Sequence, residues 1–190
     1  MTKKEARNLV NKCFANLSAK EKKNFDDRIL SNFIKFVDTN KYKKIGSYFS
    51  LHNEVNTEYL NDYLMKAGIQ IFLPKLPKDK NNKKLNFFKY LKTDKFTKNR
   101  FGILEPSKNM NPLDINELDL ILVPFRAINK NLYRLGFGGG FYDNSLAEIN
   151  SNKCLGLGYE FQILDEFDIE PHDFKLGRLI TPEGYFKNAL

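Results

Sequence analysis

Apolar residues recur every three or four positions through the first 37 residues, which is the spacing of one buried face of an α-helix. Between residues 3 and 17 they are Ala6, Leu9, Val10, Cys13, Phe14 and Leu17. Ser18 and Glu21 follow with the spacing of a capping box, in which two side chains bind free backbone amides at a helix start. The pattern predicts one helix over 3–17 and a second from Ala19 to about Val37.

Beyond residue 40 the pattern changes to short apolar runs, which are typical of buried strands. We expect strands over 44–50, 69–73, 85–91, 118–123, 154–159 and 179–181. Pro74 and Pro124 should end the second and fourth of these, because proline cannot donate to a sheet. Residues 75–117 are the least clear part, since prolines and an Asn/Lys cluster interrupt them.

Two further helices are expected between the strands. One begins with Asn56 as a cap and runs to about Ala67, where Gly68 ends it. The other covers about 141–149. Alternating strands and helices predict an α/β fold in a single three-layer domain over 1–190, with a mostly parallel sheet flanked by helices.

Composition limits the class of protein. No stretch approaches the roughly 18 apolar residues of a membrane span, and Met1–Glu5 leads into mixed charge, unlike a secretory signal. We therefore expect a cytoplasmic protein with no membrane segment, and a monomer. The only cysteines, Cys13 and Cys154, lie outside any metal-type spacing and are expected to be small buried side chains.

The formal net charge of +8 favours anionic partners such as phosphates, nucleic acid or polyglutamate. An alternative is compositional, since lysine and asparagine are abundant and tryptophan is absent, as in A/T-rich genomes. The lysine-rich runs at 20–23 and 78–84 are typical of solvated faces.

The most informative segment is 134–143, Arg-Leu-Gly-Phe-Gly-Gly-Gly-Phe-Tyr-Asp, which lies between a buried strand and a helix. Glycines let backbone amides converge on an anion, and Arg134 can contact a phosphate. A Walker A loop is excluded, because no Gly-Lys-Ser/Thr follows, and the dinucleotide fingerprint lacks its third glycine. A tight turn that only packs strand against helix stays open. Asp143 could likewise hold Mg²⁺ or only stabilise the helix start.

This segment resembles the signature of 5-formyltetrahydrofolate cyclo-ligases. Further similar pieces follow in the family's order: the basic residues Lys3, Lys4 and Arg7; residues 49–57; Phe-Gly-Ile-Leu-Glu-Pro at 101–106; the strand 118–124; and Pro-His-Asp at 171–173. The resemblance implies that ATP phosphorylates the formyl oxygen of 5-formyltetrahydrofolate and that N10 then attacks the activated carbon. The products are 5,10-methenyltetrahydrofolate, ADP and phosphate.

The resemblance also implies roles for individual residues. Arg134 and Tyr142 would be catalytic, and Mg²⁺ would be held by Asp143 and Asp173, although other carboxylates lie near Asp173. Substrate contacts would come from Phe49, Glu54, Phe137 and Phe141. ATP contacts would come from Lys3, Lys4, Arg7, Arg134, Leu135, Gly136, Phe137, Gly138, Gly139, Gly140, Phe141 and Tyr142. For the helix charges a solvated face, and for the aromatic rings core packing, remain alternatives.

The chain departs from the family pattern after Pro124, where Gly-hydrophobic-Ala-Phe-Asp and then a glycine are usual. It has Phe125-Arg126-Ala127-Ile128-Asn129, and Leu132 stands for the glycine. Two alternatives to the cyclo-ligase are a nucleic-acid-binding protein with a cyclo-ligase-like fold and another kinase-like or ligase-like enzyme. The intact 134–143 segment favours the cyclo-ligase, with no obligatory nucleic-acid partner.

Overall fold

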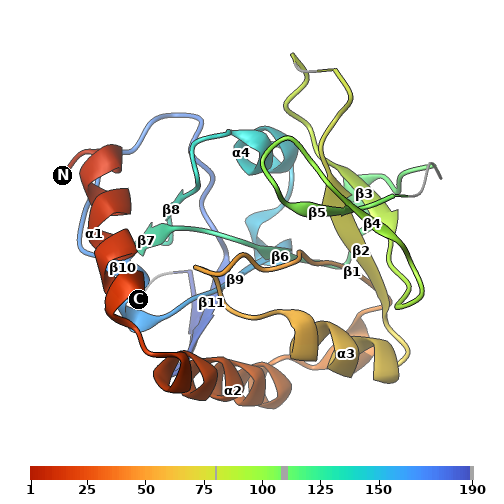
Figure 1. Ribbon diagram of the computed structural model, residues 1–190, viewed down its shortest axis with the longest axis horizontal. Coiled ribbons are helices and arrows are strands. Elements are labelled where there is room, and N and C mark those ends of the chain that lie inside the picture. Colours follow the sequence, from red (N-terminus) through yellow and green to blue (C-terminus); the bar gives the residue numbers. More distant parts are fainter. Residues whose placement is uncertain (80, 108–110, 189–190) are drawn as a thin grey trace.

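The computed structural model describes residues 1–79, 81–107 and 111–188, and within them the chain forms an α/β fold around a seven-stranded sheet (Figure 1). The strand order is β12 (Gly184–Lys187), β11 (Arg178–Thr181), β9 (Cys154–Leu157), β6 (Leu120–Val123), β1 (Lys44–Gly46), β2 (Gln70–Lys75) and β3 (Asn86–Lys89). The five inner strands are parallel to one another, and the two edge strands, β12 and β3, are antiparallel to them. The predicted fold class is confirmed.

Helices cover both faces of this sheet. Side chains of α2 (Ala19–Phe36) and α3 (Glu58–Lys66) pack on one face, and α4 (Phe141–Leu146) packs on the other, while α1 (Lys3–Asn16) joins the first core beside residues 127–129. Strand β6 contributes side chains to the cores on both faces of the sheet, because successive side chains of a strand point to opposite faces. Leu120 and Leu122 belong to the first core, and Ile121 and Val123 to the second.

Smaller elements complete the structure. A three-stranded sheet orders β10 (Ile163–Leu164), β7 (Ala127–Asn129) and β8 (Arg134–Leu135), and a hairpin pairs β4 (Phe96–Lys98) with β5 (Leu104–Pro106). Short 3₁₀ turns lie at Thr39–Lys41, Ile115–Glu117, Ser151–Lys153 and Glu160–Gln162. The sequence pattern missed β4, β5, β7, β8, β10 and β12, because strands of two to four residues are too short to show a period.

The predicted helix starts are largely confirmed. The capping box of Ser18 and Glu21 is present at α2, and Thr2 and Glu5 form another at α1 that the pattern did not reveal. The third helix begins at Glu58, one residue later than a cap at Asn56 predicts, with Thr57 at the N-cap position, but the Asn56 side-chain Oδ1 still accepts the Glu58 amide at 2.8 Å.

Several predicted bounds were wrong. The first strand ends at Gly46 instead of residue 50, the Cys154 strand ends at Leu157, and the last helix ends at Leu146 instead of Ile149. Pro74 does not end its strand, since β2 continues to Lys75. Proline is tolerated there because β1 stops at Gly46, opposite Phe72, so Pro74 needs no donor on that side.

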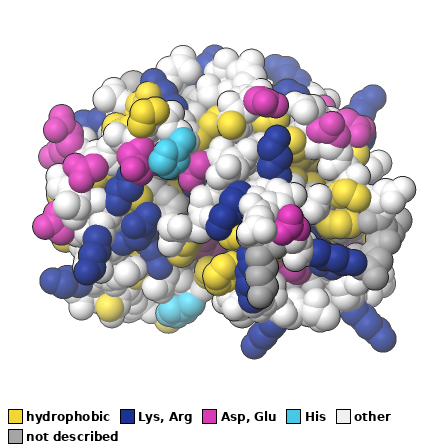
Figure 2. Space-filling model, turned by 90° about the horizontal axis from the view of Figure 1, so that it is seen from above, with side chains coloured by type: hydrophobic (Ala, Val, Ile, Leu, Met, Phe, Trp, Pro, Cys, Tyr) yellow, Lys and Arg dark blue, Asp and Glu magenta, His cyan; other side chains and the backbone are white. Residues whose placement is uncertain are grey.

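Three further expectations concern the cysteines, the distribution of charge and the membrane. Cys154 is buried as predicted, but Cys13 is only partly buried, because it lies beside the packed face of α1. On the face shown in Figure 2, basic side chains are scattered among acidic and apolar ones. Within the described ranges, no helix has both the length and the apolar character to cross a membrane.

Candidate active site

A cavity of about 500 Å³ opens where the parallel strands end. Its walls come from the start of α1, the segments after β1, β2 and β6, the β4–β5 hairpin, the glycine segment and residues 170–173. In open α/β sheets, ligands bind at this carboxyl edge. Every residue predicted for the site lines this cavity except Lys4, which is exposed on α1.

The glycine segment has the backbone geometry that only glycine adopts readily. Gly138 has φ +102° and Gly140 has φ +71°, so a side chain at either position would be strained. A Cβ at Gly139 would lie 2.9 Å from the Phe141 ring. The Arg7 Nε donates to the Gly136 carbonyl at 2.9 Å, which joins α1 to this loop. Helix α4 has six residues, so its terminus adds less positive charge than the longer predicted helix would.

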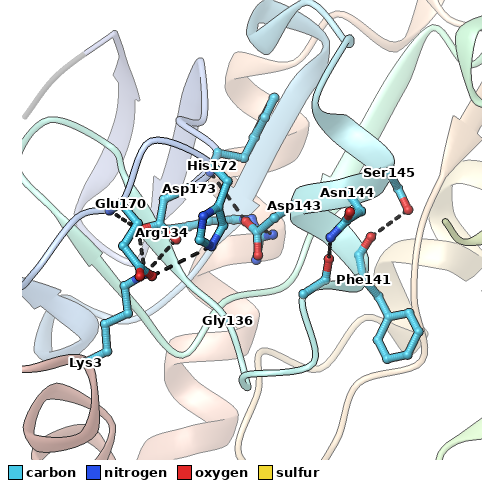
Figure 3. Close-up of polar contacts among 12 residues, drawn as sticks. Lys3, Arg134, Gly136, Phe141, Asp143, Asn144, Ser145, Glu170, His172 and Asp173 are labelled. Carbon is cyan, nitrogen blue, oxygen red and sulfur yellow. Dashed lines mark hydrogen bonds and ion pairs between the residues drawn. The ribbon is translucent and has the colours of Figure 1, made fainter. Parts of the chain in front are cut away.

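Arg134 and Asp143 form an ion pair inside the site (Figure 3). The Arg134 side chain is 2% exposed, and its Nη2 lies 2.7 Å from the Asp143 Oδ1. Burial lowers the pKa of the Arg134 guanidinium, and the Asp143 carboxylate opposes that shift. The Arg134 Nε and the Tyr142 hydroxyl are buried and have no hydrogen-bond partner within the described ranges. Both groups therefore keep donor capacity for a ligand.

A second charged group closes the other side of the cavity. The Lys3 ammonium lies 2.7 Å from the Asp173 carboxylate and also pairs with Glu170, as Figure 3 shows. Burial disfavours the charged form of Lys3, but hydrogen bonds to Asp173 and Glu170 raise its pKa above the ordinary value. Ligand atoms of Glu170, His172 and Asp173 lie within 4.8 Å of one another. Glu170 is thus one of the other carboxylates expected near Asp173, and His172, which is exposed, belongs to the same cluster.

Glu54 is a buried carboxyl group in the cavity wall. It is 5% exposed, and its Oε2 accepts the Leu51 amide at 2.6 Å. Burial raises the pKa of Glu54 to about 7, against the lowering effects of the Leu51 amide, Arg126 and Lys22. A carboxyl group with this pKa is half ionised near neutral pH and can accept hydrogen bonds from a ligand's N–H groups.

The aromatic residues predicted to contact the substrate differ in their environment. Phe49 packs edge-on against Phe96 and Tyr90, with ring centroids 4.8 and 5.5 Å away, and it also lines the cavity. Phe137 is 45% exposed, and the guanidinium carbon of Arg126 lies 4.6 Å from its ring centroid. The core-packing and ligand-stacking alternatives therefore both apply to Phe49, while Phe137 has a free face.

The sequence analysis assigned no role to Phe101, which lines the cavity, or to Arg126, which contacts Phe137 beside it. Phe101, on the β4–β5 hairpin, is 59% exposed at the cavity wall and packs edge-on against Phe141. The only signal for it was the similarity of 101–106 to a family motif. Glu105, in the same motif, mainly fixes structure, since it accepts the Leu76 amide at 2.8 Å and the Asn99 amide group at 2.7 Å. Arg126 gave no signal beyond its departure from the family pattern.

Comparison with known sequences relates this chain to one enzyme family. The sequence pattern of the 5-formyltetrahydrofolate cyclo-ligase family matches residues 1–182. A 5-formyltetrahydrofolate cyclo-ligase from Haemophilus influenzae is 32% identical over 178 residues, covering 92% of this chain and 94% of the relative. One from Escherichia coli is 31% identical over 142 residues, covering 73% and 77%.

Solved structures agree with the sequence relatives. A 5,10-methenyltetrahydrofolate synthetase from Aquifex aeolicus superimposes with a TM-score of 0.83 at 26% identity, covering 98% of this chain and 93% of that one. The synthetase from Mycoplasma pneumoniae gives 0.77 at 26% identity, covering 96% and 99%. With the cavity, the glycine segment and these matches together, the chain belongs to the 5-formyltetrahydrofolate cyclo-ligase family of enzymes.

Proposed function

We propose that this enzyme uses ATP and Mg²⁺ to convert 5-formyltetrahydrofolate to 5,10-methenyltetrahydrofolate, with release of ADP and phosphate. The observation that carries the proposal is one cavity with two chemically different sides. A glycine loop with basic residues suits phosphate on one side, and a buried carboxyl group suits the N–H groups of a pterin on the other.

The contacts of the glycine loop support phosphate binding on this side of the cavity. Arg7 is held at Gly136 by its Nε, and its Nη2 would lie only 3.8 Å from a Cβ at Gly138. The Lys3 ammonium reaches the opposite rim through its pair with Asp173. In this proposal both cations and the unpartnered Arg134 Nε bind the triphosphate of ATP. They would stabilise the charge that develops in phosphoryl transfer.

The chain also offers hard oxygen donors for Mg²⁺ next to this loop. Asp143, Asp173 and Glu170 line the same cavity, and carboxylates together with phosphate oxygens are the ligands that Mg²⁺ prefers. Bound there, the metal would neutralise charge on the phosphate oxygens. The carboxylates also have a role without ligands, because they form ion pairs that neutralise the charges of Arg134 and Lys3.

The folate side rests on Glu54 and the aromatic residues. Glu54 would accept hydrogen bonds from the pterin, and the exposed face of Phe137 would stack on the planar ligand. The buried Tyr142 hydroxyl is a donor without a partner in the described ranges; burial raises its pKa, so it stays protonated and could orient the formyl group. A cytoplasmic location and a monomeric state stay predictions.

The test is an assay of the purified chain with 5-formyltetrahydrofolate and MgATP, following the near-ultraviolet absorbance of the methenyl product. We expect product only when both substrates and Mg²⁺ are present. Gly138→Val, at a glycine with φ +102°, should remove ATP binding while the chain stays folded. A folded wild-type protein that forms no product would contradict the proposal, and unchanged ATP affinity in Gly138→Val would contradict the phosphate assignment.

A further inference from the structure

Arg126 is a cation outside the predicted site, at a position where the family pattern has an apolar residue. Its backbone is fixed on both sides. The Arg126 amide donates to the Leu135 carbonyl at 2.7 Å, and its own carbonyl accepts the Gln162 side-chain amide at 3.0 Å. These two hydrogen bonds fix the backbone of Arg126 at the edge of the sheet of β7 and β8, so its side chain starts from a fixed position beside the glycine segment.

The guanidinium of Arg126 contacts two loops at once. Its Nη1 donates to the carbonyl of Asn53 at 3.1 Å, in the segment that carries Glu54. The guanidinium carbon also lies 4.6 Å from the ring centroid of Phe137 and 5.5 Å from that of Phe14. A planar guanidinium can donate at its edge while its faces stack on rings, which an apolar side chain or a lysine cannot reproduce.

Within the described residues, the Glu54 segment has one other long-range hydrogen-bonded anchor. The Asn56 amide donates to the Asp26 Oδ1 at 3.1 Å, and the Tyr159 hydroxyl binds the same oxygen at 2.6 Å. Of the two anchors, Arg126 holds the residue next to Glu54 and carries a positive charge. Arg126 and Glu54 are near enough to influence each other's ionisation.

We propose that Arg126 is a positioning residue, whose guanidinium fixes the Glu54 segment through Asn53 and braces it against Phe137 of the glycine loop. The inference rests on the proposed function in one respect, which is that Glu54 binds the folate. It goes further because it assigns the relative position of the Glu54 segment and the glycine loop to Arg126, a residue that touches neither substrate.

The other charged groups around Glu54 are distinguishable from Arg126. Lys22 on α2 lowers the pKa of Glu54, as Arg126 does. Tyr48 and Tyr142 also interact with Glu54, but burial raises the pKa of both hydroxyls, so both stay neutral near pH 7. Removing Arg126 therefore takes away one cation near Glu54, leaves Lys22 in place and should raise the titration midpoint of Glu54.

The experiment compares wild type, Arg126→Met, Arg126→Lys and the control Arg28→Met, which breaks only an exposed ion pair with Glu183. The ¹³C signal of the Glu54 carboxyl group, assigned from its loss in Glu54→Gln, is titrated without ligands. Substrate dependence is then measured at pH 7, and melting curves confirm that each variant is folded.

We expect the Glu54 midpoint to move upward in Arg126→Met, to return toward wild type in Arg126→Lys and to stay unchanged in Arg28→Met. The KM for folate should rise roughly threefold to tenfold in Arg126→Met, because less of Glu54 is ionised, and more at pH 7 than at pH 8.5. Arg126→Lys restores the charge but not the stacked brace, so its folate KM should stay partly raised.

Two results would overturn the inference: an unchanged Glu54 midpoint in Arg126→Met, or an equal rise of both KM values at every pH, which a purely structural defect would give. Failure of the proposed function is a separate outcome. In that case wild type converts no 5-formyltetrahydrofolate, while the ligand-free titration still decides whether Arg126 acts on Glu54.

Discussion

Arg134 donates to Asp143 across 2.7 Å in a site where one was expected to bind phosphate and the other a metal ion. The same relationship joins Lys3 to Asp173, again at 2.7 Å. Each cation is thus neutralised by a carboxylate, since buried charges are costly unless paired. Binding of phosphate and Mg²⁺ would exchange these partners, giving the cations anionic oxygens and the carboxylates a metal.

Asp143→Asn should affect both function and stability. The amide keeps the shape and can still accept from Arg134, but it removes the charge that Mg²⁺ and the buried guanidinium require. We expect a large loss of turnover, a higher Mg²⁺ requirement and a loss of roughly 1–3 kcal/mol in unfolding free energy, as for a hydrogen bond to a charged group. Mg²⁺ titrations of activity and urea unfolding without ligand measure these effects.

Asp173→Asn is the matched comparison, because Glu170 lies beside it and can substitute as a metal ligand. Its Mg²⁺ requirement should rise less than that of Asp143→Asn. If Asp143→Asn unfolds much earlier yet keeps the wild-type Mg²⁺ dependence, its carboxylate only balances Arg134 and the metal binds elsewhere.

The structure predicts different roles in ATP binding for three neighbouring cations of the N-terminal helix. Lys3 and Arg7 line the cavity, whereas Lys4 is exposed away from it. We expect Lys3→Ala and Arg7→Ala each to raise the KM for ATP by about tenfold, which corresponds to one charged hydrogen bond. The KM for folate should change less.

Lys4→Ala tests the sequence expectation against the structure. The family resemblance implies an ATP contact at this position, while the geometry predicts an unchanged KM for ATP. Steady-state kinetics with each substrate varied in turn is the measurement. Equal effects of all three substitutions would show a general electrostatic attraction instead of specific contacts.

Much of the site was predictable because its signal is local. Gly138 and Gly140 are close in sequence to Phe141 and Tyr142, so one ten-residue motif contains the whole glycine side of the cavity. Glu54 was indicated by the family resemblance of residues 49–57, and it lies in the cavity wall. Residues 75–117 gave little signal, because the short β4–β5 hairpin buries few side chains of its own.

The ion pairs and Arg126 were not predictable, because they depend on distances between segments far apart in sequence. Nothing local to Lys3 indicates that it reaches Asp173, and nothing local to Arg126 indicates Asn53 and Phe137. The departure at Asn129 has a simple explanation. Its side-chain oxygen accepts the amides of Asn131 and Tyr133, both at 3.0 Å, as an aspartate would.

Glu54→Gln should stabilise the protein at neutral and alkaline pH while weakening folate binding. The pKa of Glu54 is raised to about 7 in the folded state from an ordinary 4.5. Between these values the folded state binds more protons than the unfolded state, so stability falls as pH rises. Ionised Glu54 therefore costs on the order of 3 kcal/mol above pH 8, and the neutral glutamine avoids this cost.

Urea unfolding of wild type and Glu54→Gln between pH 5 and pH 9 measures this effect. The difference in stability should be small at pH 5, grow between pH 5 and pH 7 and level off above about pH 8, with the variant more stable. Folate binding should rise through pH 7 in wild type and lose this dependence in the variant. Parallel stability curves would show that Glu54 does not titrate near neutrality.

The last prediction concerns Leu132, which stands where a glycine is usual. It has φ +64° and is fully buried in the turn between β7 and β8, so an unfavourable backbone conformation coexists with favourable packing. The left-handed conformation costs a non-glycine residue roughly 1–2 kcal/mol, whereas a buried leucine lost to alanine costs about 2–5 kcal/mol. Both Leu132→Ala and Leu132→Gly should therefore be less stable than wild type. Only glycine relieves the backbone, so Leu132→Gly should be the more stable of the two by about 1 kcal/mol, the reverse of the usual order in regular structure. Urea unfolding of the three proteins decides the matter, and an alanine variant at least as stable as the glycine variant would show that the turn carries no strain.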